Sequence, residues 1–97
     1  MPEDDAEAVR WYRLAAEQGD AGGQAQLGFM YAKGAGIPQD DVQAHTWFNL
    51  WASRSTGEAR ENAVKFRDQV ADRLTPEDRS EAQRLAREWD AAHPREP

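Results

Sequence analysis

The sequence of 97 residues contains no cysteine, which excludes disulfide bonds and zinc sites built from thiolates. It also contains no apolar run long enough to cross a membrane, and no signal-peptide pattern opens it. The net charge of −6 repels phosphate backbones, so we do not expect a nucleic-acid partner. The compartment stays open between the cytoplasm and, if an export signal was removed, the periplasm.

The sequence is poor in the residue patterns that catalysis requires. Neither of its two histidines, His45 and His93, lies in a motif that supplies a nucleophile and an orienting acid. We therefore predict that the protein is not an enzyme and needs no cofactor or metal, and we interpret His45 as a surface or partly packed side chain. The pair Asp40 and Asp41 could suggest calcium, but helix capping explains it better because acids recur at each expected helix start.

What the sequence does contain is an internal repeat. The opening "MPEDDAEAVRWY", residues 1–12, aligns without a gap with "IPQDDVQAHTWF", residues 37–48, so Trp11 corresponds to Trp47 at a shift of 36 residues. A weaker third copy, "PEDRSEA", starts at Pro76, a shift of 38 residues from Pro38. A period between about 20 and 50 residues is typical of a solenoid built from one supersecondary unit per repeat.

Each copy starts with a helix-capping pattern and continues with apolar residues at helical spacing. An acid is followed three residues later by Glu or Gln, as in a capping box: Asp4 and Glu7, Asp40 and Gln43, Asp78 and Glu81. In the third copy, Thr75 is a competing cap one turn earlier. With the glycine-rich turn around Gly34 and Gly36, the apolar stripes predict five helices, over residues 4–18, 21–33, 40–54, 58–74 and 76–92.

The segment "DDAEAVRWYRLAAEQGDAGGQAQLGFMYAKGAGIPQDD" resembles the Sel1-like repeat, a relative of the tetratricopeptide repeat. The resemblance implies an all-α fold: a short α-solenoid of antiparallel helix pairs, about five helices in all, with a degenerate C-terminal capping helix pair. We expect a single domain over 1–97, comprising a B-type helix at 4–18, a full repeat at 19–54, a cap at 55–93 and a tail at 94–97. Gly23 replaces the usual alanine, which predicts a weak start for the second helix.

The resemblance also implies a function, which is protein–protein interaction through the concave face of the solenoid by an adaptor or scaffold module. The partner-facing side of the second helix is expected to carry Gln26, Phe29, Met30 and Lys33. Packing between repeats is the competing explanation for Phe29 and Met30. Two alternatives stay open: a small ligand-binding or hydrolase-type repeat protein, favoured by a deep pocket around His45, and a structural cap of a longer repeat array.

The first helix is expected to begin the chain without the A-type helix that precedes a B-type helix in a full repeat. Its aromatic residues, Trp11 and Tyr12, lie on the apolar stripe, where core packing is the favoured explanation. Without a preceding helix, part of this stripe is expected to stay open. The sequence therefore predicts a further interface, with a second copy of the chain or with repeats upstream in a longer parent.

Two more expectations concern the packing between helices. Gly28 should let the second helix approach the third closely, near Trp47. Trp51 and Trp89 replace the small residue Ala15 at equivalent positions, so we expect Trp51 to lie against the C-terminal cap near Phe66 or Val70. The alternative is that Trp51 projects into the groove as a binding anchor.

Overall fold

The computed structural model describes residues 4–94, and this part of the chain forms five α-helices and no strand. Pro2 of the repeat and residues 95–97 of the expected tail lie outside the described residues. The fold is all-α, in agreement with the expected helix order. The helices are α1 (Asp5–Glu17), α2 (Ala21–Lys33), α3 (Asp41–Ser53), α4 (Gly57–Ala71) and α5 (Pro76–Ala92).

Side-chain caps fix the starts of four helices. Asp4 accepts hydrogen bonds from the backbone N–H groups of Ala6 and Glu7, and Asp40 accepts one from Gln43. Asp20 caps α2 in the same way by accepting a hydrogen bond from the N–H of Gly23, and this cap was not predicted from the sequence. For α5, the structure decides between the two expected caps, Asp78 and Thr75, and Asp78 is not the cap. The residue that caps this helix is Thr75, whose hydroxyl accepts from the N–H of Asp78, and Pro76 then occupies the first turn.

The helix ends follow local backbone chemistry. Gly34 ends α2 in the left-handed region, at φ 71°, and its N–H donates to the carbonyl of Met30. Helix α4 ends at Ala71, three residues before the expected end at Leu74. The backbone N–H groups of Arg73 and Leu74 reach back only three residues, to Val70 and Ala71, so the last turn tightens ahead of the proline that starts α5.

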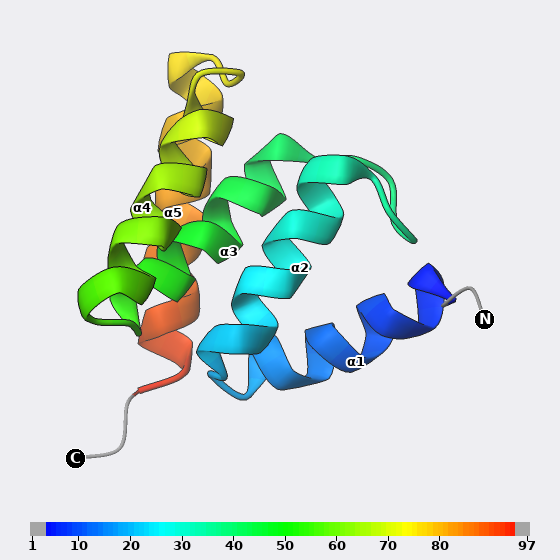
Figure 1. Cartoon of the computed structure of the whole chain (residues 1–97). Helices are drawn as coiled ribbons and strands as arrows, with labels where there is room; N and C mark the ends of the chain where they lie inside the picture. Colours follow the sequence, from blue (N-terminus) through cyan, green and yellow to red (C-terminus); the bar gives the residue numbers. More distant parts are fainter. Residues whose placement is uncertain (1–3, 95–97) are drawn as a thin grey trace.

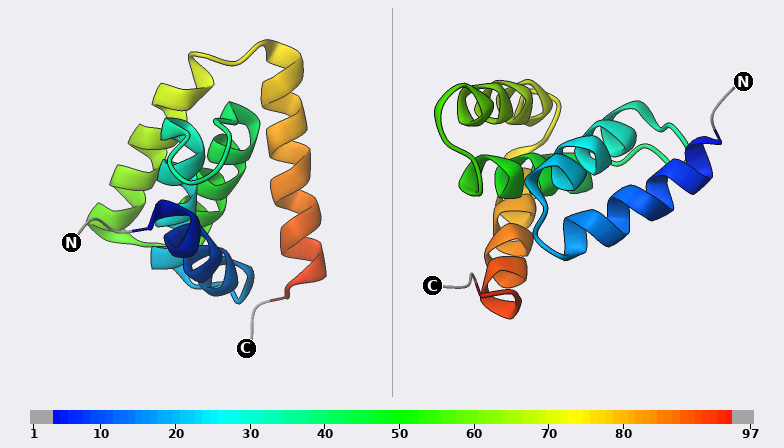
Figure 2. Two further views of the ribbon diagram at one scale, coloured as in Figure 1. Left: turned by 90° about the vertical axis from the view of Figure 1, so that its right-hand side faces the viewer. Right: turned by 60° about the horizontal axis from the view of Figure 1, so that its bottom comes forward.

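Helix α3 is the centre of the fold. It packs against α2, α4 and α5, whereas α1 packs mainly against α2. Figure 1 shows α1 diverging from α2 toward its N-terminal end, where the loop around Gly36 meets it, and Figure 2 shows α4 and α5 on either side of α3. The cap is therefore not a tightly packed helix pair of its own, because both of its helices pack on α3.

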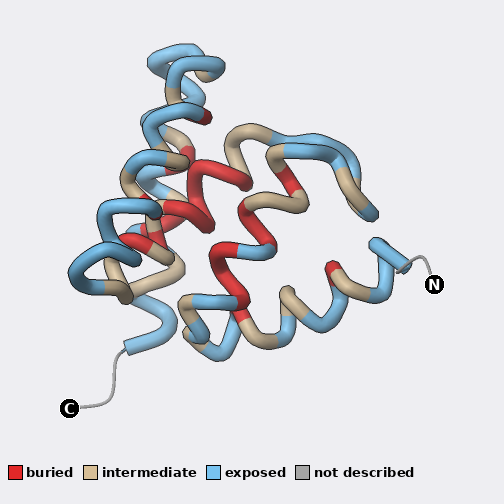
Figure 3. Tube along the Cα trace, viewed as in Figure 1, coloured by how far each residue is buried: buried red, intermediate tan, exposed pale blue. Residues whose placement is uncertain are grey.

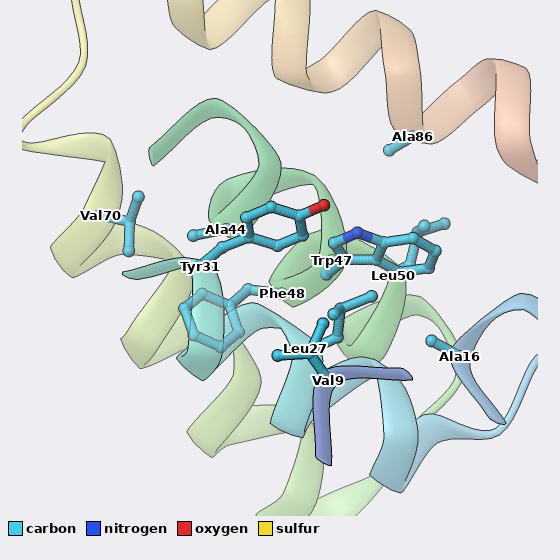
Figure 4. Close-up of a cluster of buried hydrophobic side chains, with 10 residues drawn as sticks. All are labelled: Val9, Ala16, Leu27, Tyr31, Ala44, Trp47, Phe48, Leu50, Val70 and Ala86. Carbon is cyan, nitrogen blue, oxygen red and sulfur yellow. The ribbon is translucent and has the colours of Figure 1, made fainter. Parts of the chain in front are cut away.

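The buried residues concentrate on α2 and α3 (Figure 3). Phe48 and Leu50 of α3 and Leu27 of α2 are the largest apolar side chains that are fully buried, and Val9 and Ala16 attach α1 to this cluster (Figure 4). Trp47 meets Trp89 of α5 edge-on, with ring centroids 5.9 Å apart. This contact helps to hold α5 against α3.

Two glycines permit the close approach of α2 to its neighbours. A Cβ atom built on Gly28 would lie 2.6 Å from Cε1 of Phe48, so α2 and α3 are as close as this glycine allows. The close neighbour is thus Phe48, not Trp47 as expected. Gly23 is buried and equally tight, because a Cβ atom built on it would lie 2.6 Å from the Cβ atom of Ala15 in α1. The interhelical contact gives a reason for the glycine at this position, and the Asp20 cap on its N–H supports the helix start that was expected to be weak.

Candidate functional site

A groove between α2 and α4 is the main candidate binding surface of the described residues. It has a volume of about 230 Å³, and we call it the α2–α4 groove. Phe48 of α3 forms its floor. The residues that line it are Phe29, Ala32, Lys33, Phe48, Phe66, Gln69, Val70 and Arg73.

The base of the groove is an aromatic cluster. The ring of Phe29 lies edge-on to Phe48 and to Phe66, with centroid distances of 5.0 Å and 4.8 Å. Trp51 stacks on Phe66 at 6.4 Å with an interplanar angle of 17°. Trp51 therefore lies against the C-terminal cap near Phe66, as expected, although it is half-buried. Edge-on and offset contacts of this kind hold aromatic rings in fixed orientations, which gives the groove a defined apolar base.

The rim of the groove is polar and positively charged. Lys33 places its Nζ atom 5.9 Å from the centroid of the Phe29 ring and forms no ion pair within residues 4–94. Arg73 is held by Asp41 of α3 through two hydrogen bonds of 2.7 Å and 3.1 Å, and these raise the pKa of Arg73. In a chain with a net charge of −6, an apolar groove with a cationic rim suits a partner segment with apolar and acidic side chains.

The structure brings some of the candidate partner-binding residues together and separates others. Phe29 and Lys33 both line the groove. Gln26 is exposed on the same helix but outside the groove, and Met30 is half-buried against the core. Gln69 and Arg73 were not predicted, because only the packing of both α2 and α4 on α3 brings these side chains to the rim.

The N-terminal helix carries a separate surface. The expectation of core packing for Trp11 is wrong, because 64% of this residue is exposed, and Leu14 beside it is 54% exposed. Glu7, Arg10, Trp11 and Leu14 line a shallow pocket of about 220 Å³, which we call the α1 strip. Tyr12 points elsewhere on the helix and packs partly against the core. The α1 strip and the α2–α4 groove share no lining residue, so the six candidates do not form one site.

The pocket around His45 lacks the arrangement that a hydrolase needs. His45 is buried, not surface or partly packed as expected, because residues of α4 and α5 flank it on α3. Burial is the main cause that lowers its pKa below 6.5. Asp68 lines the same pocket but binds Arg67, and no serine, threonine or cysteine lines it. Within residues 4–94 there is also no group of His, Cys, Asp and Glu side chains that could hold a metal ion.

No helix in the described part of the chain has both the length and the apolar character that a membrane span requires. A further, more open pocket of about 650 Å³ lies between the α1–α2 turn and the end of α5, and it is lined by Glu17, Gln18, Gly19, Arg54, Trp89, His93 and Pro94.

Comparison with known proteins gives two findings. The family described as Sel1 repeat matches residues 1–20 and 21–55. A protein from Rhizobium leguminosarum bv. viciae, described as an exopolysaccharide production negative regulator, is 53% identical over 60 residues. That match covers 62% of this chain and 22% of the length of the Rhizobium protein, so the chain spans less than a quarter of that relative.

Proposed function

We propose that this chain, which belongs to the Sel1 repeat family, is an adaptor or scaffold module that binds a partner protein in the α2–α4 groove. Sel1 repeats are protein-interaction repeats, and the similar Rhizobium protein is described as a negative regulator. The observation that carries the proposal is the combination of an aromatic base with the cationic rim of Lys33 and Arg73. Aromatic anchors within a polar rim are the usual composition of protein-binding surfaces.

The proposed partner segment places an apolar side chain over the rings of Phe29 and Phe66 and acidic side chains near Lys33. Lys33 is the better anchor for such an acid, because Arg73 is already engaged by Asp41. This chemistry supports a regulatory role through binding and not through catalysis. The hydrolase alternative has no nucleophile beside His45 in the described residues to support it.

A selection from random short peptides displayed on phage tests the groove. We expect the selected peptides to contain an aromatic or large aliphatic residue next to Asp or Glu. Lys33→Glu reverses the rim charge without touching the core and should weaken binding of these peptides at least tenfold. Lys65→Glu makes the same charge reversal at an exposed position of α4 outside the groove and is the matched control. Equal binding to both variants would show that the peptides bind elsewhere.

A second interface is supported by a separate observation, the exposure of Trp11 and Leu14 in the α1 strip. Large apolar residues that lie side by side on a surface commonly mark an interface. We propose that a second copy of the chain covers the α1 strip. Light scattering at micromolar concentration should then report a dimer for the native chain and a monomer for Leu14→Glu. A monomeric native chain would refute this self-association.

A further inference from the structure

The face between α4 and α5 carries a polar pocket that the proposed interaction surfaces do not use. Its volume is about 270 Å³, and α3 forms its base between the two flanking helices. It occupies a different face of α4 from the groove, because the two sites share no lining residue of that helix. The polar residues that line it are His45 and Asn49 of α3, Arg67 and Asp68 of α4, and Arg79 and Gln83 of α5.

His45 forms the buried wall of this pocket. The residue is only 3% exposed, and its Nδ1 atom is buried without a hydrogen-bond partner among residues 4–94. A buried polar atom without a partner is costly, and native structures contain few of them. Burial and then the charge of Arg67 lower the pKa of His45, while Asp68 opposes them. The imidazole is therefore neutral at pH 7, with one nitrogen as donor and the other as acceptor.

The charges around the ring leave one cation without a counter-ion. Arg67 donates to Asp68 at 3.1 Å and to the Oδ1 atom of Asn49 at 3.3 Å, so its charge is already matched. The guanidinium of Arg79 forms no ion pair and no hydrogen bond within the described residues. The pocket thus has a net charge of +1 in a chain whose net charge is −6.

We propose that this pocket binds a carboxylate group, held by the guanidinium of Arg79 and by the side-chain amide of Gln83. A carboxylate carries one negative charge, which matches the single free cation, and its planar oxygens suit the fork of a guanidinium. A phosphate monoester carries about −1.5 to −2 charges at pH 7, which exceeds the single free cation and is repelled more strongly by Asp68 than one carboxylate charge is. The ligand is a free small carboxylate or the terminal carboxylate of a protein chain, which share this chemistry.

Titration of the isotope-labelled chain with sodium acetate, at constant ionic strength and pH 7, tests the proposal by nuclear magnetic resonance. We expect saturable shifts of the His45 ring signals and of the Arg79 side-chain N–H signal. Arg79→Gln should weaken acetate binding at least tenfold. Arg87→Gln removes the same charge from an exposed site on α5 outside the pocket and should bind acetate as the native chain does. Shifts that do not saturate, or that are equal in both variants, would refute the site.

A third variant tests the pocket without removing a cation. Gln83→Glu places a carboxylate in the wall at an exposed position of α5, so it should fold normally and abolish acetate binding by occupying the site internally. Unchanged acetate affinity in this variant would contradict the proposal. Inorganic phosphate that binds more tightly than acetate would overturn the choice of a carboxylate.

The source of the carboxylate is distinguished by N-acetylglycine, which mimics the end of a protein chain. Binding at least tenfold tighter than acetate assigns the pocket to a chain terminus, and equal binding assigns it to a free small carboxylate. N-acetylglycinamide lacks the charge and should not bind, and binding of this neutral analogue would refute carboxylate recognition.

Discussion

Helices α1 and α3 are two copies of one sequence unit, yet they have opposite surroundings. Trp11 and Trp47 occupy the same position of the repeat, but Trp47 is only 5% exposed and Trp11 is 64% exposed. The next pair repeats the contrast, because Leu50 is 1% exposed and Leu14 is 54% exposed. Helix α3 packs against three helices, and α1 packs mainly against one. The repeat therefore sets which face of a helix is apolar, and its neighbours decide whether that face is buried.

The positions at which the two copies differ fit these surroundings. Val9 of α1 corresponds to His45 of α3, and both side chains are buried. Ala15 corresponds to Trp51, which stacks on Phe66 of α4. Helix α1 has no neighbouring helix in the corresponding place within the described residues. The second copy has thus gained residues that use its extra neighbours. The pocket beside His45 and the aromatic base of the groove both depend on these replacements.

The largest expected difference between the copies comes from removing the tryptophan of each. Trp47→Ala deletes a buried ring that contacts Trp89 and should lower the free energy of unfolding by about 3–5 kcal/mol. Trp11→Ala removes an exposed ring and should change it by less than about 0.5 kcal/mol. Urea denaturation of the two variants measures both values at a concentration at which the chain is monomeric. Similar losses in both variants would mean that α1 is covered as α3 is.

The contact of α3 with α2 can be disrupted at Gly28. Gly28→Ala forces a methyl group against the ring of Phe48 and should lower the free energy of unfolding by about 1–3 kcal/mol. Gly22→Ala lies on the exposed side of the same helix, where the nearest atom is an oxygen of Asp20 at 3.4 Å. This matched control should stabilise the chain by up to about 1 kcal/mol, because alanine favours helix. If Gly28→Ala were stabilising as well, the helices would not be in the close contact described above.

The replacement of valine by histidine predicts a pH dependence that α3 has and α1 lacks. The folded state lowers the pKa of His45 below its ordinary value of 6.5. At pH values between the pKa of the folded state and 6.5, the unfolded chain therefore binds more protons than the folded chain. The free energy of unfolding should therefore fall as pH decreases through about 6.5 toward 5. His45→Val restores the residue of the first copy and should flatten this part of the profile. Urea denaturation across this range measures it, and identical profiles would contradict the burial of a neutral ring.

The smallest expected difference concerns the acids in the first turns. Asp41 of α3 pairs with Arg73 across the groove rim, whereas its counterpart Asp5 in α1 has no ion pair within residues 4–94. A negative charge in the first turn stabilises a helix, so Asp5→Asn and Asp41→Asn both lose this contribution to stability. The additional loss in Asp41→Asn should be at most about 1 kcal/mol, because Arg73 is half-exposed and water screens the pair. High salt should remove the difference in thermal unfolding, and a larger difference that salt leaves unchanged would indicate another role for Asp41.

Much of the fold was predictable because it depends on interactions between residues close in the chain. The capping acids Asp4 and Asp40 and the helix-ending Gly34 act within one turn of helix, so the sequence alone determines where these helices start and stop. The apolar stripe of each helix follows from its period of 3.6 residues. At α5 the same local rules left two possible caps, and the proline at position 76 agrees with the choice of Thr75.

The surfaces depend on contacts between residues far apart in the chain, and only the tertiary structure decided them. The groove requires that Lys33 lie near Gln69 and Arg73, and the pocket requires that His45 lie between Arg67 and Arg79. These residues come from different helices, so no interaction within one helix determines that they meet. The exposure of Trp11 is the clearest case, because its sequence environment matches that of the buried Trp47. The sequence by itself determined five helices and their apolar faces, since hydrogen bonds and side-chain spacing within a helix are local. The packing of α4 and α5 on α3 decided which of these faces meet solvent, because burial depends on which other helix covers a side chain.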